Sequence, residues 1–169
     1  PMGFVASERF TSLIYTLLNT ISNYGNCEVS SSVVTWYGTH LSDQGKYQEG
    51  YEYGQLGAKL LDKFPSPNID SGNISMQGAW IQPWIGSIHG LITPLKEAGY
   101  LAIKQGVFEN GCYNLINRLI LMWGIGSPLP LFLSDAEECH SICQRTNQEA
   151  TRIITAMFAQ AALNLSEKS

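Results

Sequence analysis

Apolar residues recur at three- and four-residue steps along most of this chain, and no stretch shows the strict alternation of a half-buried β-strand. Clusters of glycine and proline interrupt the pattern and mark turns. The spacing predicts eight helices, over residues 6–23, 31–44, 46–64, 70–85, 88–105, 107–123, 131–145 and 147–165. We therefore expect an all-α fold of antiparallel helical hairpins, stacked as a short and irregular solenoid over one domain, residues 1–169.

The predicted helix over residues 46–64 contains three glycines, Gly50, Gly54 and Gly57. Each glycine costs about 1 kcal/mol relative to alanine inside a helix. A second helix that packs too closely to admit a β-carbon would offset this cost. The glycines thus predict a close helix–helix contact.

A pattern of small and aromatic residues returns after 61 positions. Its members are Gly38, Gly45, Tyr47 and Gly50, then Gly99, Gly106, Phe108 and Gly111. In each unit a small residue comes first, then a turn glycine, an aromatic residue expected to plug the turn, and a second small residue. This order is typical of a tetratricopeptide hairpin, whose usual period of about 34 residues is shorter than the one here. We expect an irregular repeat, with an additional helix that Pro83 kinks or ends between the two units.

Several further motifs resemble the tetratricopeptide-like helical region of large multidomain signalling proteins. Those proteins join a Ser/Thr protein-kinase-like domain, a STAND-type AAA ATPase, this helical region, a GAF domain and often a histidine kinase. The resemblance covers most of Trp36 to Leu165 and is carried by Glu49–Leu61, Trp80, Trp84, Pro94–Tyr100 and Gln160–Leu165. It implies a non-catalytic scaffold that couples neighbouring ATPase or kinase domains. Pro1 ahead of Met2 adds the expectation of a fragment cut from a larger chain.

The composition narrows the classes of partner. Charged residues make up 14% of the chain, against about 25% in a typical domain, so we expect a protein partner to cover some apolar surface. A net charge of −4 without a basic block makes nucleic acid an unfavoured partner. The longest apolar run, Leu119–Ile125, is too short to span a membrane. Sparse cysteines without paired spacing suggest reduced thiols and a cytoplasmic location.

No catalytic motif is visible in the sequence. Phosphate-binding loops and protein-kinase signatures are missing, so we predict no catalytic residue and no cofactor. Cys139, His140 and Cys143 could supply part of a zinc site, but His140 would point about 100° away from the two cysteines on a helix. We therefore predict no metal and interpret Cys139 and Cys143 as a buried structural pair.

The best binding candidates follow from the register of the repeat. The inner face of the first helix of such hairpins often binds peptides, and the corresponding positions are Thr35, Thr39 and Ser42 in one unit and Lys96, Tyr100 and Lys104 in the other. The last three lie in one row, where two ammonium groups beside an aromatic ring could hold an acidic peptide. Two alternatives to the scaffold therefore stay open. One is a free-standing adaptor for acidic peptides. The other is a small-molecule sensor with a pocket between helices, lined by Trp80, Trp84 and Trp123.

Overall fold

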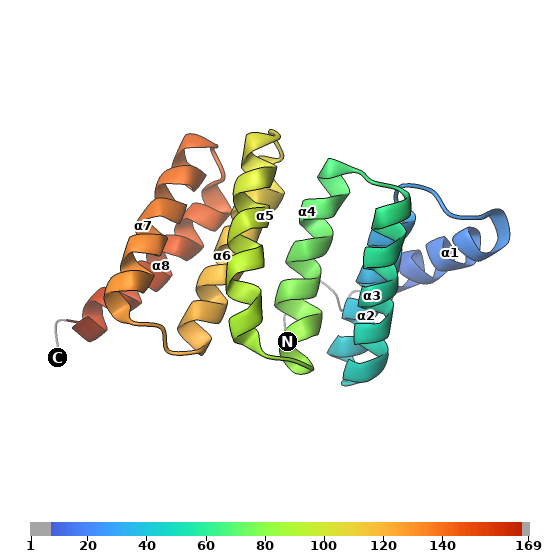
Figure 1. Ribbon diagram of the computed structural model, residues 1–169, viewed down its shortest axis with the longest axis horizontal. Coiled ribbons are helices and arrows are strands. Elements are labelled where there is room, and N and C mark those ends of the chain that lie inside the picture. Colours follow the sequence, from blue (N-terminus) through green and yellow to red (C-terminus); the bar gives the residue numbers. More distant parts are fainter. Residues whose placement is uncertain (1–7, 167–169) are drawn as a thin grey trace. The chain divides into compact units, whose positions relative to one another are not determined.

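The computed structural model describes residues 8–166, apart from the side chains of residues 67 and 68. It confirms the all-α prediction, because its elements are helices throughout and the described residues form no strand (Figure 1). The α-helices are α1 (Glu8–Tyr24), α2 (Ser30–Asp43), α3 (Tyr47–Lys63), α4 (Pro67–Met76), α5 (Ile92–Lys104), α6 (Phe108–Gly124), α7 (Leu129–Arg145) and α8 (Glu149–Ser166). Short π- and 3₁₀-helical segments are η1 (Gln77–Ile81), η2 (Gln82–Trp84) and η3 (Ile88–Leu91).

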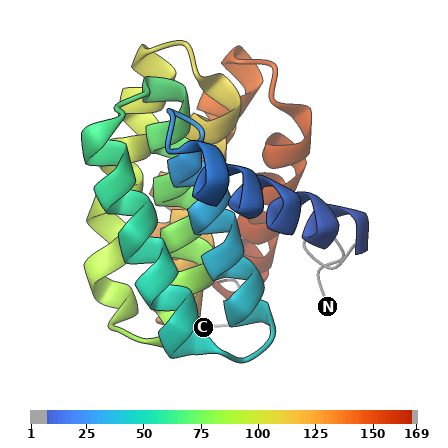
Figure 2. The same ribbon diagram turned by 90° about the vertical axis from the view of Figure 1, so that its right-hand side faces the viewer.

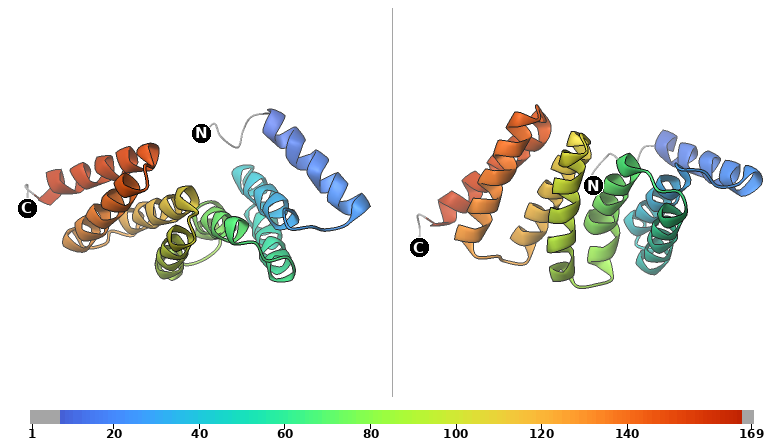
Figure 3. Two further views of the ribbon diagram at one scale, coloured as in Figure 1. Left: turned by 90° about the horizontal axis from the view of Figure 1, so that it is seen from above. Right: turned by 45° about the horizontal axis from the view of Figure 1, so that its top comes forward.

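The chain forms two compact units, where the sequence predicted one domain. Unit 1 covers Pro1–Ser87 and unit 2 covers Ile88–Ser169. In unit 1, α2 and α3 form a hairpin, α1 lies obliquely across α2 (Figure 2), and α4 and η1 also contact α2. In unit 2, the hairpins α5–α6 and α7–α8 pack on each other through α6 (Figure 3). The described part of unit 1 thus contains one antiparallel hairpin with further helices packed on it, and that of unit 2 contains two hairpins.

Four of the helix-ending turns share one backbone geometry. Gly45, Gly106, Gly126 and Asn147 have φ angles between 56° and 81°. In each turn, this residue donates its N–H to the carbonyl three residues back, and the next N–H goes to the carbonyl five residues back. This is the Schellman motif, which satisfies the last carbonyls of the helix. The predicted turn glycines are confirmed, and Asn147 takes the same place between α7 and α8.

The small residues of the repeat lie where two helices touch. A β-carbon on Gly38 would lie 2.6 Å from the Gly50 carbonyl oxygen, and one on Gly50 would lie 2.6 Å from the Gly38 oxygen. In unit 2, a β-carbon on Gly99 would lie 3.2 Å from the Gly111 oxygen, and the reverse distance is 3.0 Å. The same glycine–glycine contact therefore occurs within each of the two hairpins, as the 61-residue repeat predicted.

The other two glycines of α3 also face close neighbours. A β-carbon on Gly57 would collide with the Thr35 hydroxyl of α2, and one on Gly54 would lie 3.2 Å from Cδ1 of Ile81. Two neighbouring elements thus leave no room for larger residues at the three glycines of α3. They are α2, along most of the helix, and η1, beside Gly54. The prediction of a close helix approach is confirmed.

The predicted helix over residues 70–85 changes its hydrogen bonding before it ends. The α-helical part stops at Met76, a π-helical turn follows, and Pro83 lies in a 3₁₀ segment. Proline lacks an N–H and its ring collides with the carbonyl four residues back, which disfavours regular helix here. Ile81 ends the π-helical turn with 1% of its surface exposed and fills the space beside Gly38 and Gly54. The sequence anticipated the break, and the structure adds this packing role.

The aromatic residues of the repeat do not plug the turns. Tyr47 and Phe108 are the first residues of α3 and α6, and they are 38% and 42% exposed. Tyr47 instead stacks on Trp84, with ring centroids 5.1 Å apart. The turns before them are closed by backbone hydrogen bonds instead.

The first testable consequence concerns the contact between α5 and α6. Gly111→Ala would place a β-carbon 2.6 Å from Cγ1 of Ile103 and 3.0 Å from the Gly99 carbonyl oxygen. This collision should outweigh the helix propensity that alanine adds, and lower the free energy of unfolding by about 1–2 kcal/mol. Urea unfolding followed by circular dichroism measures the change. Gly124→Ala, in the same helix with no neighbour within 4 Å, is the control and should not destabilise. Equal stability of the two variants would contradict the close contact.

Candidate functional site

A buried polar site in the described part of unit 2 joins three helices. Asp135 of α7 accepts a hydrogen bond of 2.7 Å from Nη2 of Arg118 on α6, and one of 3.1 Å from Nζ of Lys96 on α5. Lys96 also lies 3.6 Å from a carboxylate oxygen of Glu138. Asp135 and Arg118 are buried, whereas Lys96 is about one-third exposed. The two cations and two anions balance, so the site carries no net charge.

The charges of this site determine which groups stay ionised. Burial alone would raise the pKa of Asp135, but hydrogen bonds and charge from Arg118 and Lys96 outweigh it, so the pKa is lowered. Burial and a hydrogen bond with Glu138 raise the pKa of Tyr100. Nζ of Lys96 lies 5.8 Å from the centre of the Tyr100 ring. Asp135 therefore stays a carboxylate and Tyr100 a neutral phenol, and neither is set up to transfer a proton near neutral pH.

The space at this site is about 10 Å³, lined by the charged residues and by Tyr100, Leu115, Leu119 and Cys139. That volume admits one water molecule at most. A substrate cannot enter, so the geometry supports a role in holding α5, α6 and α7 together.

The two rows of predicted binding residues lie in different surroundings. Lys96 and Tyr100 enter the charge network described above, and Lys104 lies exposed at the end of α5. Thr35, Thr39 and Ser42 are 0%, 2% and 4% exposed, in the helix that packs closely on α3.

The row in unit 1 is therefore no binding surface, and this part of the register argument is wrong. Thr39 and Ser42 donate to carbonyl oxygens four residues back, 3.1 Å away in each case. The Thr35 hydroxyl occupies the notch that Gly57 leaves. The glycines of α3 bring that helix so close that the polar face of α2 is covered.

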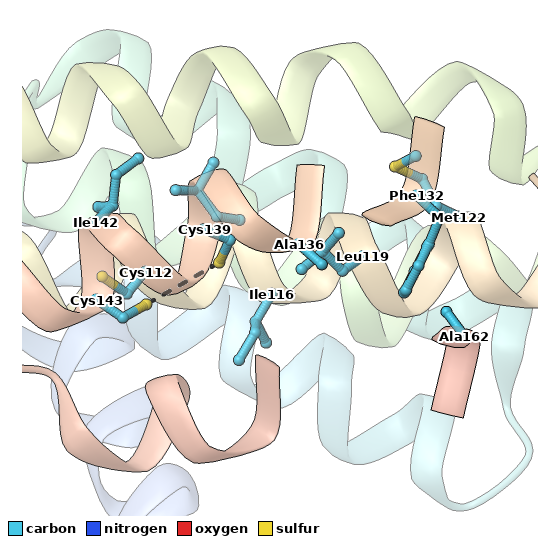
Figure 4. Close-up of a cluster of buried hydrophobic side chains, with 11 residues drawn as sticks. Cys112, Ile116, Leu119, Met122, Phe132, Ala136, Cys139, Ile142, Cys143 and Ala162 are labelled. Carbon is cyan, nitrogen blue, oxygen red and sulfur yellow. Dashed lines mark hydrogen bonds between the residues drawn. The ribbon is translucent and has the colours of Figure 1, made fainter. Parts of the chain in front are cut away.

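Three of the four cysteines gather in the core of unit 2, whereas Cys27 is exposed in unit 1. Cys139 and Cys143 are buried with their sulfur atoms 4.0 Å apart, as a buried pair predicts, and Cys112 of α6 joins them (Figure 4). A hydrogen bond with Cys143 and burial both raise the pKa of the Cys112 thiol. In the part of the chain that the structure describes, no group of three or more His, Cys, Asp or Glu side chains is arranged to hold a metal ion. The sequence analysis did not predict that Cys112 joins this pair, because Cys112 is far from Cys139 and Cys143 along the chain.

The second candidate surface is one face of α8. Gly106 and Asn147 occupy the same turn position, so each residue of α6 corresponds to the residue 41 positions later in α8. By this correspondence Cys112 and Ile116 match Ile153 and Met157. The α6 residues are 0% and 3% exposed in the core beneath hairpin α7–α8, whereas Ile153 and Met157 are 48% and 66% exposed. Leu163 and Leu165 extend the exposed apolar residues of α8.

The tryptophans named for a pocket between helices make separate aromatic contacts. Trp84 stacks on Tyr47 in unit 1 and is 58% exposed, and Trp123 packs against Phe132 and Phe158 in unit 2.

Comparisons with known proteins place the chain in no family, because no protein-family model, no curated protein and no solved structure matches it. The resemblance to the helical region of multidomain signalling proteins therefore stays a prediction. No described helix has the length and apolar character that crossing a membrane requires.

The buried carboxylate of Asp135 gives the second prediction. Asp135→Asn should destabilise the protein by about 3 kcal/mol at neutral pH, because it leaves Arg118 buried without a counter-charge. The pKa of Asp135 is lowered in the folded state. Its stabilising contribution is therefore complete above the unfolded pKa of about 3.9 and is lost as the pH falls through the lower folded value.

Urea unfolding at several pH values tests this. The stability difference between wild type and Asp135→Asn should be largest at neutral pH and should shrink in acid. Glu149→Gln is the control, since it removes the carboxylate of the exposed Arg152 pair and should change stability little at any pH. A constant difference across the pH range would contradict the assigned charge state of Asp135.

Proposed function

We propose that this chain is a non-catalytic protein-interaction module, and that the apolar face of α8 binds a helix of the partner. The single observation that carries the proposal is the correspondence between α6 and α8. At matched positions, α6 buries its apolar residues under the next hairpin and α8 leaves its own exposed. In α6 the matched face is covered by a helical hairpin, α7–α8. A helix of a partner could cover the face of α8 in the same way.

The chemistry of the α8 face supports a helical partner. Ile153 and Met157 are four residues apart and so lie on one face of the helix, and Leu163, which matches the buried Met122 of α6, lies at the edge of that face. Exposed apolar stripes of this kind mark interaction sites in soluble proteins. The opposite stripe, Thr151, Thr155 and Ala162, is buried within unit 2. The exposed residues are therefore not needed for the packing of α8 on its own hairpin.

The resemblance to multidomain signalling proteins suggests where the partner helix belongs. We propose that it lies in a neighbouring ATPase or kinase domain of the same chain, so that the module couples that domain to others. A cytoplasmic location goes with this proposal. The parent protein would carry the nucleotide-binding and phosphoryl-transfer residues, for which this sequence has no motif.

The adaptor for acidic peptides has weaker support. Lys96 directs its ammonium group at Asp135 and Glu138. An acidic peptide would have to displace both carboxylates from Lys96, and one of them is buried. Of the two lysines in that row, only Lys104 takes part in none of the described ion pairs.

The third prediction tests the α8 face through self-association. At high concentration, a second copy of the chain should supply the covering helix, so sedimentation equilibrium should show a reversible dimer. Met157→Glu places a charge in the middle of the stripe and should abolish the dimer. Leu131→Glu changes a residue of α7 that is 54% exposed, and it should leave the dimer intact. The assignment of the α8 face is wrong if Met157→Glu associates as strongly as wild type.

A further inference from the structure

Unit 1 contains a groove of about 340 Å³ whose floor is α2 and whose walls are α1 and α3. This volume lies at the lower end of the range of small-molecule sites. The lining consists of aliphatic side chains, three tyrosines, one serine and one asparagine, and none of its residues is charged. The groove is distinct from both the buried charge network and the α8 face, which belong to unit 2.

Three tyrosines, one from each helix, form one end of the groove. The ring centroids of Tyr15 and Tyr37 lie 5.7 Å apart, and those of Tyr37 and Tyr53 lie 4.7 Å apart. Both pairs meet edge to face, a favourable arrangement that fixes the rings. Burial, together with the neighbouring Tyr15 and Tyr53, raises the pKa of Tyr37. Tyr37 therefore offers a neutral hydroxyl group beside the flat apolar faces of the rings.

The middle of the groove is aliphatic, and its other end is polar. Leu18 and Ile21 of α1 face Leu56 and Leu60 of α3 across the floor residue Val34. Beyond them, Ser22 and Asn26 bring a hydroxyl and an amide to the end of α1 and the following loop. A bound molecule would thus meet hydrogen-bonding groups at both ends and only apolar surface between them.

The dimensions of the groove suit a small molecule. Along α3 the lining runs from Tyr53 to Leu60, which corresponds to about 10 Å at 1.5 Å per residue. A groove of this length and of about 340 Å³ lies within the range of sites that hold small molecules.

We propose that this groove binds a small, uncharged and largely apolar molecule with a hydrogen-bonding group. The uncharged lining favours an uncharged ligand, because a charged ligand would lose its hydration without gaining a counter-ion from the lining. The tyrosine rings favour an aromatic group at one end. This proposal concerns unit 1 alone, so its failure would leave the α8 proposal standing.

A matched pair of fluorescent probes tests the proposal. N-phenyl-1-naphthylamine is neutral, and 8-anilino-1-naphthalenesulfonate carries the same ring system with a sulfonate. Titration of the full chain should show saturable, one-to-one binding of the neutral probe, with enhanced fluorescence. The anionic probe should bind at least about tenfold more weakly. Equal affinity for the two probes, or no saturable binding of the neutral one, would overturn the proposal.

Two variants place the binding in the groove. Leu56→Arg puts a charge on a wall residue that is 44% exposed, and it should weaken the neutral probe at least about tenfold. Leu13→Arg is the control, since Leu13 is 53% exposed on α1 outside the lining and should leave the affinity unchanged. Circular dichroism should show equal helix content in both variants. Retained binding in Leu56→Arg would place the probe elsewhere, and the proposal would then be wrong.

Discussion

The close approach of two helix backbones at paired glycines is the contact on which both units depend. In unit 1 the approach of Gly38 and Gly50 leaves no room for a β-carbon on either residue, and Gly99 and Gly111 repeat the contact in unit 2. Glycine inside a helix costs about 1 kcal/mol, so these positions are retained only where packing offsets that cost. The close approach then determines which side chains the neighbouring helix can show to solvent. The hydroxyl face of α2, which a wider hairpin would expose, is covered for this reason.

The two units complete their packing differently once the paired glycines have set the hairpins. Unit 1 inserts Ile81 from a π-helical turn beside Gly54. Unit 2 joins its hairpins with an apolar core and with the carboxylate of Asp135 between two cations. An ion pair between buried groups adds little net stability, but it penalises any arrangement that separates the partners. The charge network therefore fixes the register of α5, α6 and α7 more than it strengthens their association.

The sequence predicted the helices and the repeat because both depend on local spacing. Apolar periodicity located the eight helices within a few residues, and the 61-residue repeat identified the turn glycines and the contact glycines. The repeat did not identify the third hairpin, α7–α8, because Asn147 stands in place of the turn glycine. Asparagine can adopt the left-handed backbone conformation that this turn requires. The charge network and the grouping of Cys112 with Cys143 depend on tertiary distance, which spacing does not encode. The same limit made the row of Thr35, Thr39 and Ser42 look exposed.

The division between charged and uncharged surfaces connects the two proposed sites. Glu49 and Glu52 of α3 lie outside the groove lining, although they share a helix with Tyr53 and Leu56. On α8, the Glu149–Arg152 pair lies at the first turn, ahead of the stripe that begins at Ile153. The groove lining itself thus contains no charged residue, whereas on α8 Glu149 precedes Ile153 by one turn on the same face. Desolvating a charge is costly, whereas burying apolar area is favourable. Both surfaces are mainly apolar and are thus suited to apolar partners, which we propose are a helix on α8 and a small molecule in the groove.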